Sequence, residues 1–185
     1  MTPYATGLFI HFLGMVGLFV GYGLEWTASS LLRQSTTSNQ VRSLLRIYRL
    51  SLPISGPGLL ILILSGGYLG SITGSMKQGW IEATLLGIVL ALGIGFVLIL
   101  PRMKALRAAL PESDAPLSEK GRALVRDAMI VTLIRVRAML AVGIVYLMTA
   151  KPGSLATSVF VLLGFIVAGM LFAATAWTSR PSEKA

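Results

Sequence analysis

The chain has 185 residues, no cysteine and a formal net charge of +9. Hydrophobic residues make up 55% of it and charged residues only 12%, with a mean hydropathy of +0.79. This is more apolar surface than one soluble core can bury, so the composition indicates a membrane protein. The lack of cysteine excludes disulfides, thiolate metal ligands and cysteine nucleophiles.

Five apolar runs of about 20 residues are each long enough to cross the hydrocarbon core as a helix. They cover residues 5–24, 52–73, 80–100, 129–149 and 154–177. No alternating strand pattern competes with them. The sequence therefore predicts an all-α, polytopic transmembrane helical bundle of five spans, forming a single domain over residues 1–185. No Lys or Arg and no cleavage site marks the first run as a signal peptide, so we expect it to be retained.

The first span places the only histidine of the chain on a face of small and polar residues. At about 100° per residue, one narrow sector of the helix holds these residues. They are Gly7, His11, Gly14, Leu18, Gly21, Tyr22 and Glu25. Because small residues let another helix approach closely, we expect this face to look into the bundle and His11 to point at protein.

A histidine at this depth needs a hydrogen-bond partner, a ligand or a metal. His11 could be a heme or metal ligand, a proton relay, or the donor of a simple hydrogen bond. The polar residues predicted at a similar depth are Tyr68, Glu82, Thr84 and Tyr146. We expect His11 to bond to a tyrosine or to Glu82 beside a small cavity, with no metal bound. Glu82 could equally face water, because it lies near a helix end.

The basic residues are distributed unevenly between the loops. Of the 16 Lys and Arg residues, all but Lys77 and Lys151 lie in the first loop, in the third loop and the start of span four, or in the tail. Cytoplasmic loops retain Lys and Arg, which predicts an N-terminus outside and a C-terminus inside. We expect a multi-pass protein of the bacterial cytoplasmic (inner) membrane. The same distribution explains the net charge without nucleic acid as a partner.

The stretch 40–50 in the first loop has the pattern of an interfacial amphipathic helix. Arg42, Arg46 and Arg49 recur at i, i+4 and i+7, opposite an apolar face. This face could bind anionic lipid headgroups or a cytoplasmic partner. Alternatively, the stretch is a solvated connector whose charges only set the topology. Pro53 then suits the start of span two, or a kink within it.

Two arginines enter span four about two turns from its basic side. Arg135 and Arg137 point some 200° apart on the helix, so they cannot face the same way. One can extend to the headgroups. The other should look inward, where Glu25 is an available counter-ion. We expect a structural ion pair between Glu25 and one of the two arginines.

Two segments carry a resemblance to known proteins. LFIHFLGMVGLFVGYGL in the first span and GWIEATLLGIVLAL in the third resemble a family of small bacterial integral membrane proteins built on a domain of unknown function. More distantly, the chain resembles the heme-binding bundles of copper-resistance protein D and membrane-bound protoporphyrinogen oxidase. That likeness implies a heme ligand at His11 and a second histidine in a later span. This chain has one histidine, and Glu82 stands where the oxidase-like proteins place a lysine.

Two classes of function follow. The sequence has no paired catalytic constellation, which favours a non-enzymatic scaffold, accessory or lipid-interacting membrane protein. Its expected partners are membrane lipids, including anionic headgroups, and a membrane-protein partner or a second copy of the chain. The alternative is a heme-binding redox protein or a small-solute transporter that uses a pocket around His11. An optical spectrum separates the heme case, because bound heme gives a Soret band.

The predicted orientation can be tested with reporter fusions. A fluorescent protein fused after residue 115 should fold and fluoresce, and alkaline phosphatase fused there should be inactive, because the third loop is predicted inside. Fusions after residue 76, in the predicted outer loop, should give the opposite pair of results. An active phosphatase at residue 115 would overturn the orientation.

Overall fold

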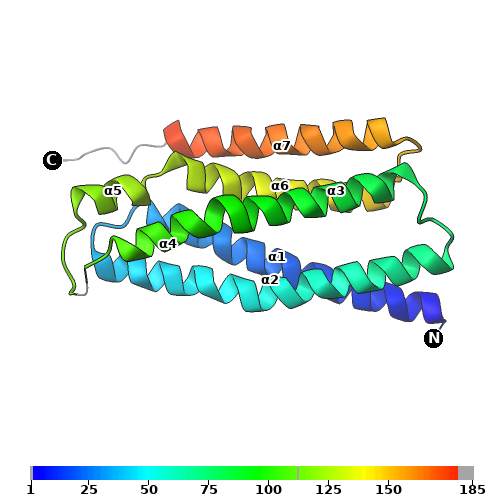
Figure 1. Cartoon of the computed structure of the whole chain (residues 1–185), viewed down its shortest axis with the longest axis horizontal. Coiled ribbons are helices and arrows are strands. Elements are labelled where there is room, and N and C mark those ends of the chain that lie inside the picture. Colours follow the sequence, from blue (N-terminus) through cyan, green and yellow to red (C-terminus); the bar gives the residue numbers. More distant parts are fainter. Residues whose placement is uncertain (1, 112, 179–185) are drawn as a thin grey trace.

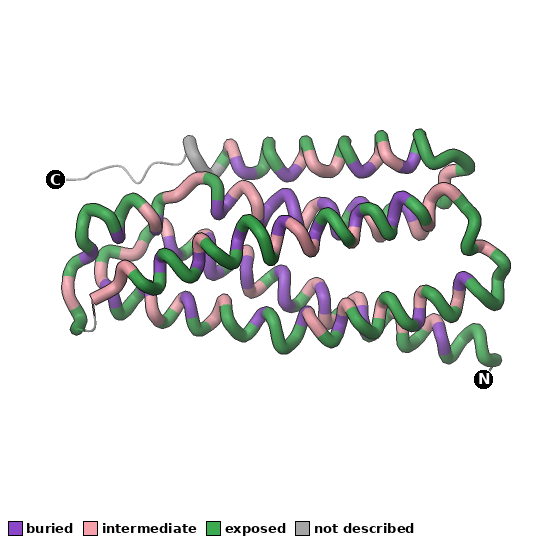
Figure 2. The backbone as a smooth tube through the Cα atoms, viewed as in Figure 1, coloured by how far each residue is buried: buried purple, intermediate pink, exposed green. Residues whose placement is uncertain are grey.

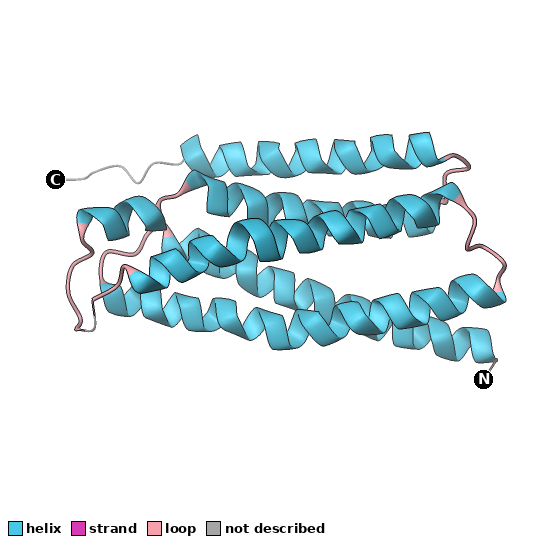
Figure 3. Cartoon of the chain, viewed as in Figure 1, coloured by secondary structure: helices cyan, strands magenta, loops and turns pink. Residues whose placement is uncertain are grey.

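The computed structural model describes residues 2–111 and 113–178. Every regular element in these residues is a helix (Figure 3). The elements are α1 (Pro3–Leu32), α2 (Ser38–Ile72), α3 (Gly79–Gly93), the π-helix η1 (Ile94–Ile99), α4 (Leu100–Ala108), α5 (Glu119–Val125), α6 (Ala128–Ala150) and α7 (Leu155–Thr178). Five of the described stretches are long and apolar enough to cross a membrane, which confirms the predicted all-α bundle of five spans. The basic tail residues Arg180 and Lys184 lie outside the described residues.

The spans run alongside one another, with their connections at the two ends of the molecule (Figure 1). The N-terminus and the α2–α3 and α6–α7 connections lie at one end. The α1–α2 and α4–α5 connections lie at the other, which we call the basic end because Arg42, Arg46 and Arg107 are there. α1 packs on α2, α6 packs on α7 and α3, and α1 also touches α6.

The close packing of α1 on α2 depends on the small residues of both helices. A side chain at Gly14 would begin 2.8 Å from the carbonyl oxygen of Gly58, and one at Gly58 would begin 2.7 Å from the backbone nitrogen of Leu18. Gly21 lies against Ser51 and Ser55 in the same way. Gly7, Gly14, Leu18, Gly21, Tyr22 and Glu25 are all buried, as the purple positions along α1 in Figure 2 indicate. The face predicted to look into the bundle therefore does so.

α2 differs from the predicted arrangement. The stretch 40–50 and span two are one uninterrupted helix, and Pro53 and Pro57 lie inside it. The apolar face of the stretch does not cover lipid. Val41 and Leu45 are buried in a core cluster that also contains Met103 and Leu106 of α4. The arginines on the opposite face are thus attached to a helix that is anchored by packing at the basic end.

The start of α2 is held by its own cap and by the α4–α5 connection. Thr37 and Gln40 form a capping box, in which each side chain accepts from the backbone of the other. The buried Ser38 donates its hydroxyl to the carbonyl of Ser113 at 2.8 Å and accepts from the backbone nitrogen of Ala115 at 3.1 Å. These bonds fix the position of α2 relative to the end of α4, and so the position of the arginines that both helices carry.

The contact between α1 and α2 predicts a sharp difference between two glycines of α2. Gly58→Val should destabilise the protein by about 1–3 kcal/mol, because the new methyl groups meet backbone atoms of α1 that cannot move aside. Gly67 meets nothing within 4 Å, so Gly67→Val is the matched control. Thermal melting in detergent should show a lower midpoint for Gly58→Val alone. Equal midpoints would contradict the close approach.

Candidate functional site

A buried ion pair joins α1 to α6. Glu25 is 5% exposed and Arg137 is 9% exposed. Arg137 donates from Nη2 to Oε2 of the carboxylate, and the hydroxyl of Ser51 on α2 donates to Oε1 at 2.8 Å. Both carboxylate oxygens therefore have a partner, which a charge at this depth requires. One acidic side chain thus connects three helices.

The guanidinium of Arg137 is enclosed by two further groups. It lies 4.6 Å from the centroid of the Tyr22 ring, a favourable cation–π position. On its other side is Gly95 of η1, where any side chain would collide with Nη1 of Arg137. π-helical turns are rare and occur often at functional sites. Here the π-helical turn and the missing side chain make room for the arginine between α1 and the third span.

Arg135 is not part of the ion pair. Its guanidinium donates to the carbonyl of Phe172 on α7 and lies 5.0 Å from the centroid of the Trp26 ring. The expectation that the second arginine extends to the headgroups is wrong, because Arg135 is only 9% exposed. Its Nε is buried without a hydrogen-bond partner among the described residues. The two arginines do point to different neighbours, as their spacing predicts.

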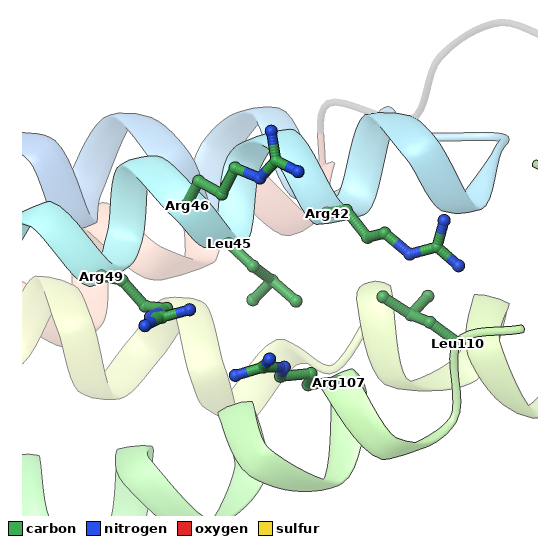
Figure 4. A pocket seen from close by; sticks show the side chains of 6 residues that line it. All are labelled: Arg42, Leu45, Arg46, Arg49, Arg107 and Leu110. Carbon is green, nitrogen blue, oxygen red and sulfur yellow. The ribbon is translucent and has the colours of Figure 1, made fainter. Parts of the chain in front are cut away.

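A second site, the arginine pocket, lies at the basic end between α2 and α4 (Figure 4). It encloses about 530 Å³ and is lined by Arg42, Leu45, Arg46, Arg49, Arg107 and Leu110. Three arginines come from successive turns of α2 and the fourth from the facing α4. None of the described residues that line the pocket is acidic. Guanidinium groups gathered in this way can donate hydrogen bonds to an anion rich in oxygen, such as a phosphate.

Glu25, Asp114 and Asp127 are engaged with partners outside the pocket. Within residues 2–111 and 113–178, the two ion pairs are Arg137 with Glu25 and Arg102 with Asp127, the latter at 3.8 Å. Asp114 accepts from the backbone nitrogen of Asn39 at 3.3 Å. Arg42 donates to the side-chain oxygen of Asn39, a neutral group. The charge of the arginine pocket is therefore not neutralised by the described part of the chain.

A cleft of about 600 Å³ continues from the arginine pocket toward the ion pair. The two cavities share Leu45, Arg49 and Arg107. Apolar side chains of α2 and of the third span form most of its walls, and Tyr22, Glu25, Ser51, Ser55 and Arg137 are also among its lining residues. The arginine pocket and the ion pair thus lie at two places along one cavity.

His11 forms a hydrogen bond to Ser65, not to a tyrosine or to Glu82. Its Nδ1 lies 3.0 Å from the Ser65 hydroxyl, which also donates to the carbonyl of Ile61 at 2.5 Å. Ser65 and Ile61 both belong to α2. Gly66 of the same helix has no side chain, which leaves space for the imidazole ring of His11. The expected partner was wrong for two reasons. Glu82 lies on another span, α3, and Tyr68 lies on α2 but packs against Gly7, so Ser65 is the α2 side chain at the level of His11.

The other residues predicted near His11 are not assembled into a site. Tyr68, Glu82 and Tyr146 are exposed, and no hydrogen bond links any of them to His11 in the described residues. Tyr68 packs at Gly7, and the Tyr146 ring lies 6.0 Å from that of Phe165. No cluster of three His, Cys, Asp or Glu residues with the geometry of a metal site occurs in the part of the chain that the structure describes.

Arg42, Arg46 and Arg49 could be predicted as candidate lipid-binding residues from the sequence, whereas Arg107 and the cleft could not. The i, i+4, i+7 spacing predicts one arginine face of α2, but it does not indicate which helix lies opposite. Ser51 was also missed. It is buried and lies on the same face of α2 as Ser55 and Gly58, so small-residue spacing in span two was the signal that could have found it.

The fold and these sites define a polytopic helical membrane protein with a buried ion pair and a basic pocket at one end. Residues 7–152 match the family described as predicted integral membrane protein (DUF2269), and the chain belongs to this family. No curated protein and no solved structure matches the chain. The family match covers the ion pair, the arginine pocket and the cleft.

The ion pair predicts a strong coupling between two substitutions. Glu25→Gln should destabilise the protein by about 3–5 kcal/mol, because it leaves the Arg137 charge buried without a counter-ion. Arg137→Gln should cost a similar amount, and the double variant should cost much less than the sum. Arg135→Gln is the control, since Arg135 does not contact Glu25 and should be additive with Glu25→Gln. Additivity of Glu25→Gln with Arg137→Gln in detergent melting would contradict the pair.

Proposed function

We propose that this protein is a non-enzymatic, lipid-interacting membrane protein that binds the phosphate headgroup of an anionic phospholipid in its arginine pocket. It acts in the bacterial cytoplasmic membrane, with the basic end in the inner leaflet. The observation that carries the proposal is the arrangement of Arg42, Arg46, Arg49 and Arg107 around one hollow that has no acidic side chain among its described lining residues. Such an arrangement is electrostatically unfavourable unless an anion occupies it.

The depth of the pocket agrees with a headgroup ligand. Arg46, Arg49 and Arg107 are exposed, and they lie on helical extensions just beyond the apolar parts of their spans. A side chain in that position meets the headgroup region of a bilayer. Each Lys or Arg near an anionic surface contributes about 1 kcal/mol of binding free energy. Four arginines therefore supply enough attraction to retain one anionic lipid against exchange with neutral ones.

The simpler interpretation, a solvated loop that only sets topology, does not explain the fold of this region. A connector needs positive charge but no defined geometry. Here the α2 arginines are fixed opposite Arg107 by the capping box at Thr37 and by the Ser38 bonds to the α4–α5 connection. The fixed spacing between two arginine-bearing helices supports a binding site.

The proposal is tested by neutralising the pocket. A variant with Arg46→Gln, Arg49→Gln and Arg107→Gln should lose about 3 kcal/mol of binding, on the order of a hundredfold in affinity, for phosphatidylglycerol. Native mass spectrometry of the protein titrated with phosphatidylglycerol in detergent measures the loss. Binding of phosphatidylcholine should change little, and wild-type binding of the anionic lipid should weaken with added salt.

A charge-matched control separates the pocket from the net charge. Lys120, Arg122 and Arg126 are exposed at the same end and do not line the pocket. Their triple replacement by Gln removes the same three charges and should leave phosphatidylglycerol binding nearly unchanged. Equal losses in the two triple variants would mean that only the overall charge attracts lipid, and the proposed site would be refuted.

A further inference from the structure

The arginine pocket opens along the molecule into the cleft between α2 and the third span. We propose that this cleft holds a hydrocarbon chain of the same anionic phospholipid, so that the site binds a whole lipid, headgroup and chain, in a lateral opening of the bundle. The inference rests on the proposed function, because the headgroup in the arginine pocket is what places the chain.

The cleft exists because α2 and α3 do not pack on each other along most of their length. α2 packs on α1 and approaches the third span at α4 and, near the opposite end, at Gly70, which lies beside Ile81; α3 packs on α6 and α7. Leu52 and Leu59 of α2 face the cleft from one side, and Leu92, Phe96 and Leu100 from the other. Phe96 is 55% exposed. These walls are apolar, so they suit a hydrocarbon chain and not a water-soluble ligand.

The length of the cleft matches a chain in one leaflet. It extends from Arg107 at its mouth past Gly95 to Ala91. The part between Arg107 and Gly95, which lies beside the ion pair, is about 18 Å long at 1.5 Å per residue of helix. Half of a typical hydrocarbon core is about 15 Å. A lipid whose phosphate lies among the four arginines would therefore extend its chain along the cleft to the level of Glu25 and Arg137.

The charge at the mouth of the cleft favours a phospholipid over a helix of a partner protein. Apolar groups of α2 and of the third span line the inner part of the cleft, and Arg49, Lys104 and Arg107 line its mouth. Basic residues at the mouth also require an anionic group there, which a phospholipid carries in the same molecule as its chain. A phospholipid matches both features, its chain the apolar walls and its headgroup the basic mouth.

One glycine allows the chain site to be blocked without disturbing the fold. Gly56 lines the cleft, and a side chain built there meets nothing within 4 Å. Gly56→Leu should therefore fill the space of the lipid chain while leaving the helix contacts intact. Gly67→Leu, also on α2 and also in open space, does not line the cleft and is the matched control.

The test is a titration of each variant with dioleoyl phosphatidylglycerol, followed by native mass spectrometry, and a parallel titration with glycerol phosphate, which has the charged group but no chain. Gly56→Leu should weaken binding of the lipid about tenfold relative to Gly67→Leu, because part of the apolar contact is displaced. Glycerol phosphate should bind both variants equally. Gly56→Ala, which fills less of the cleft, should give a smaller loss.

The outcomes separate the chain site from the headgroup site. If Gly56→Leu retains the lipid as well as Gly67→Leu does, while the arginine variants lose it, the cleft does not hold the chain and the headgroup site stands. If Gly56→Leu instead dissociates an oligomer without affecting lipid, a second copy occupies the cleft and the inference is overturned. If the arginine variants keep the lipid, the proposed function itself has failed.

Discussion

The burial of the Glu25 charge inside the bundle is the constraint on which the arrangement of the spans depends. A carboxylate at this depth is tolerated only when its oxygens are satisfied by protein. Arg137 and Ser51 satisfy them, and they come from α6 and α2. The ion pair therefore connects the hairpin of α1 and α2 to the group formed by α3, α6 and α7. Apolar packing alone would specify this junction poorly, since lipid competes equally well for an apolar helix face.

The same junction explains why a cleft remains beside it. α1 approaches α2 closely through Gly14, Gly21 and Gly58, which draws α2 toward α1 and away from the third span. The third span is held in turn by α6 and α7, and its Gly95 accommodates the Arg137 side chain. The two groups of helices thus meet along α1 and α6 and diverge between α2 and α3. The arginines of α2 and α4 lie where this opening reaches the basic end.

The spans and the buried face of α1 could be predicted from sequence because each depends on one helix alone. Apolar length identifies a span, and the 3.6-residue period places Gly14, Gly21 and Glu25 on one face. What pairs with that face depends on which helices become neighbours, and periodicity carries no such information. An arginine partner for Glu25 could be predicted because buried charges in the membrane are few. The hydrogen bond between His11 and Ser65 could not be predicted, since many residues can accept or donate one hydrogen bond.

Arginine has two different roles in this chain, and burial separates them. Arg137 is paired with the Glu25 carboxylate, which also accepts from Ser51, and lies against the Tyr22 ring. Its charge is therefore neutralised within the fold. Arg46, Arg49 and Arg107 line a hollow in which no described lining residue is acidic. At the opposite end, Lys151 lies 5.8 Å from the centroid of the Trp80 ring, which gives that cation an aromatic partner. The arginine pocket thus differs from both of these sites in that none of its described lining residues is an acidic or aromatic partner for its arginines, and it is there that we propose an anion of the membrane binds.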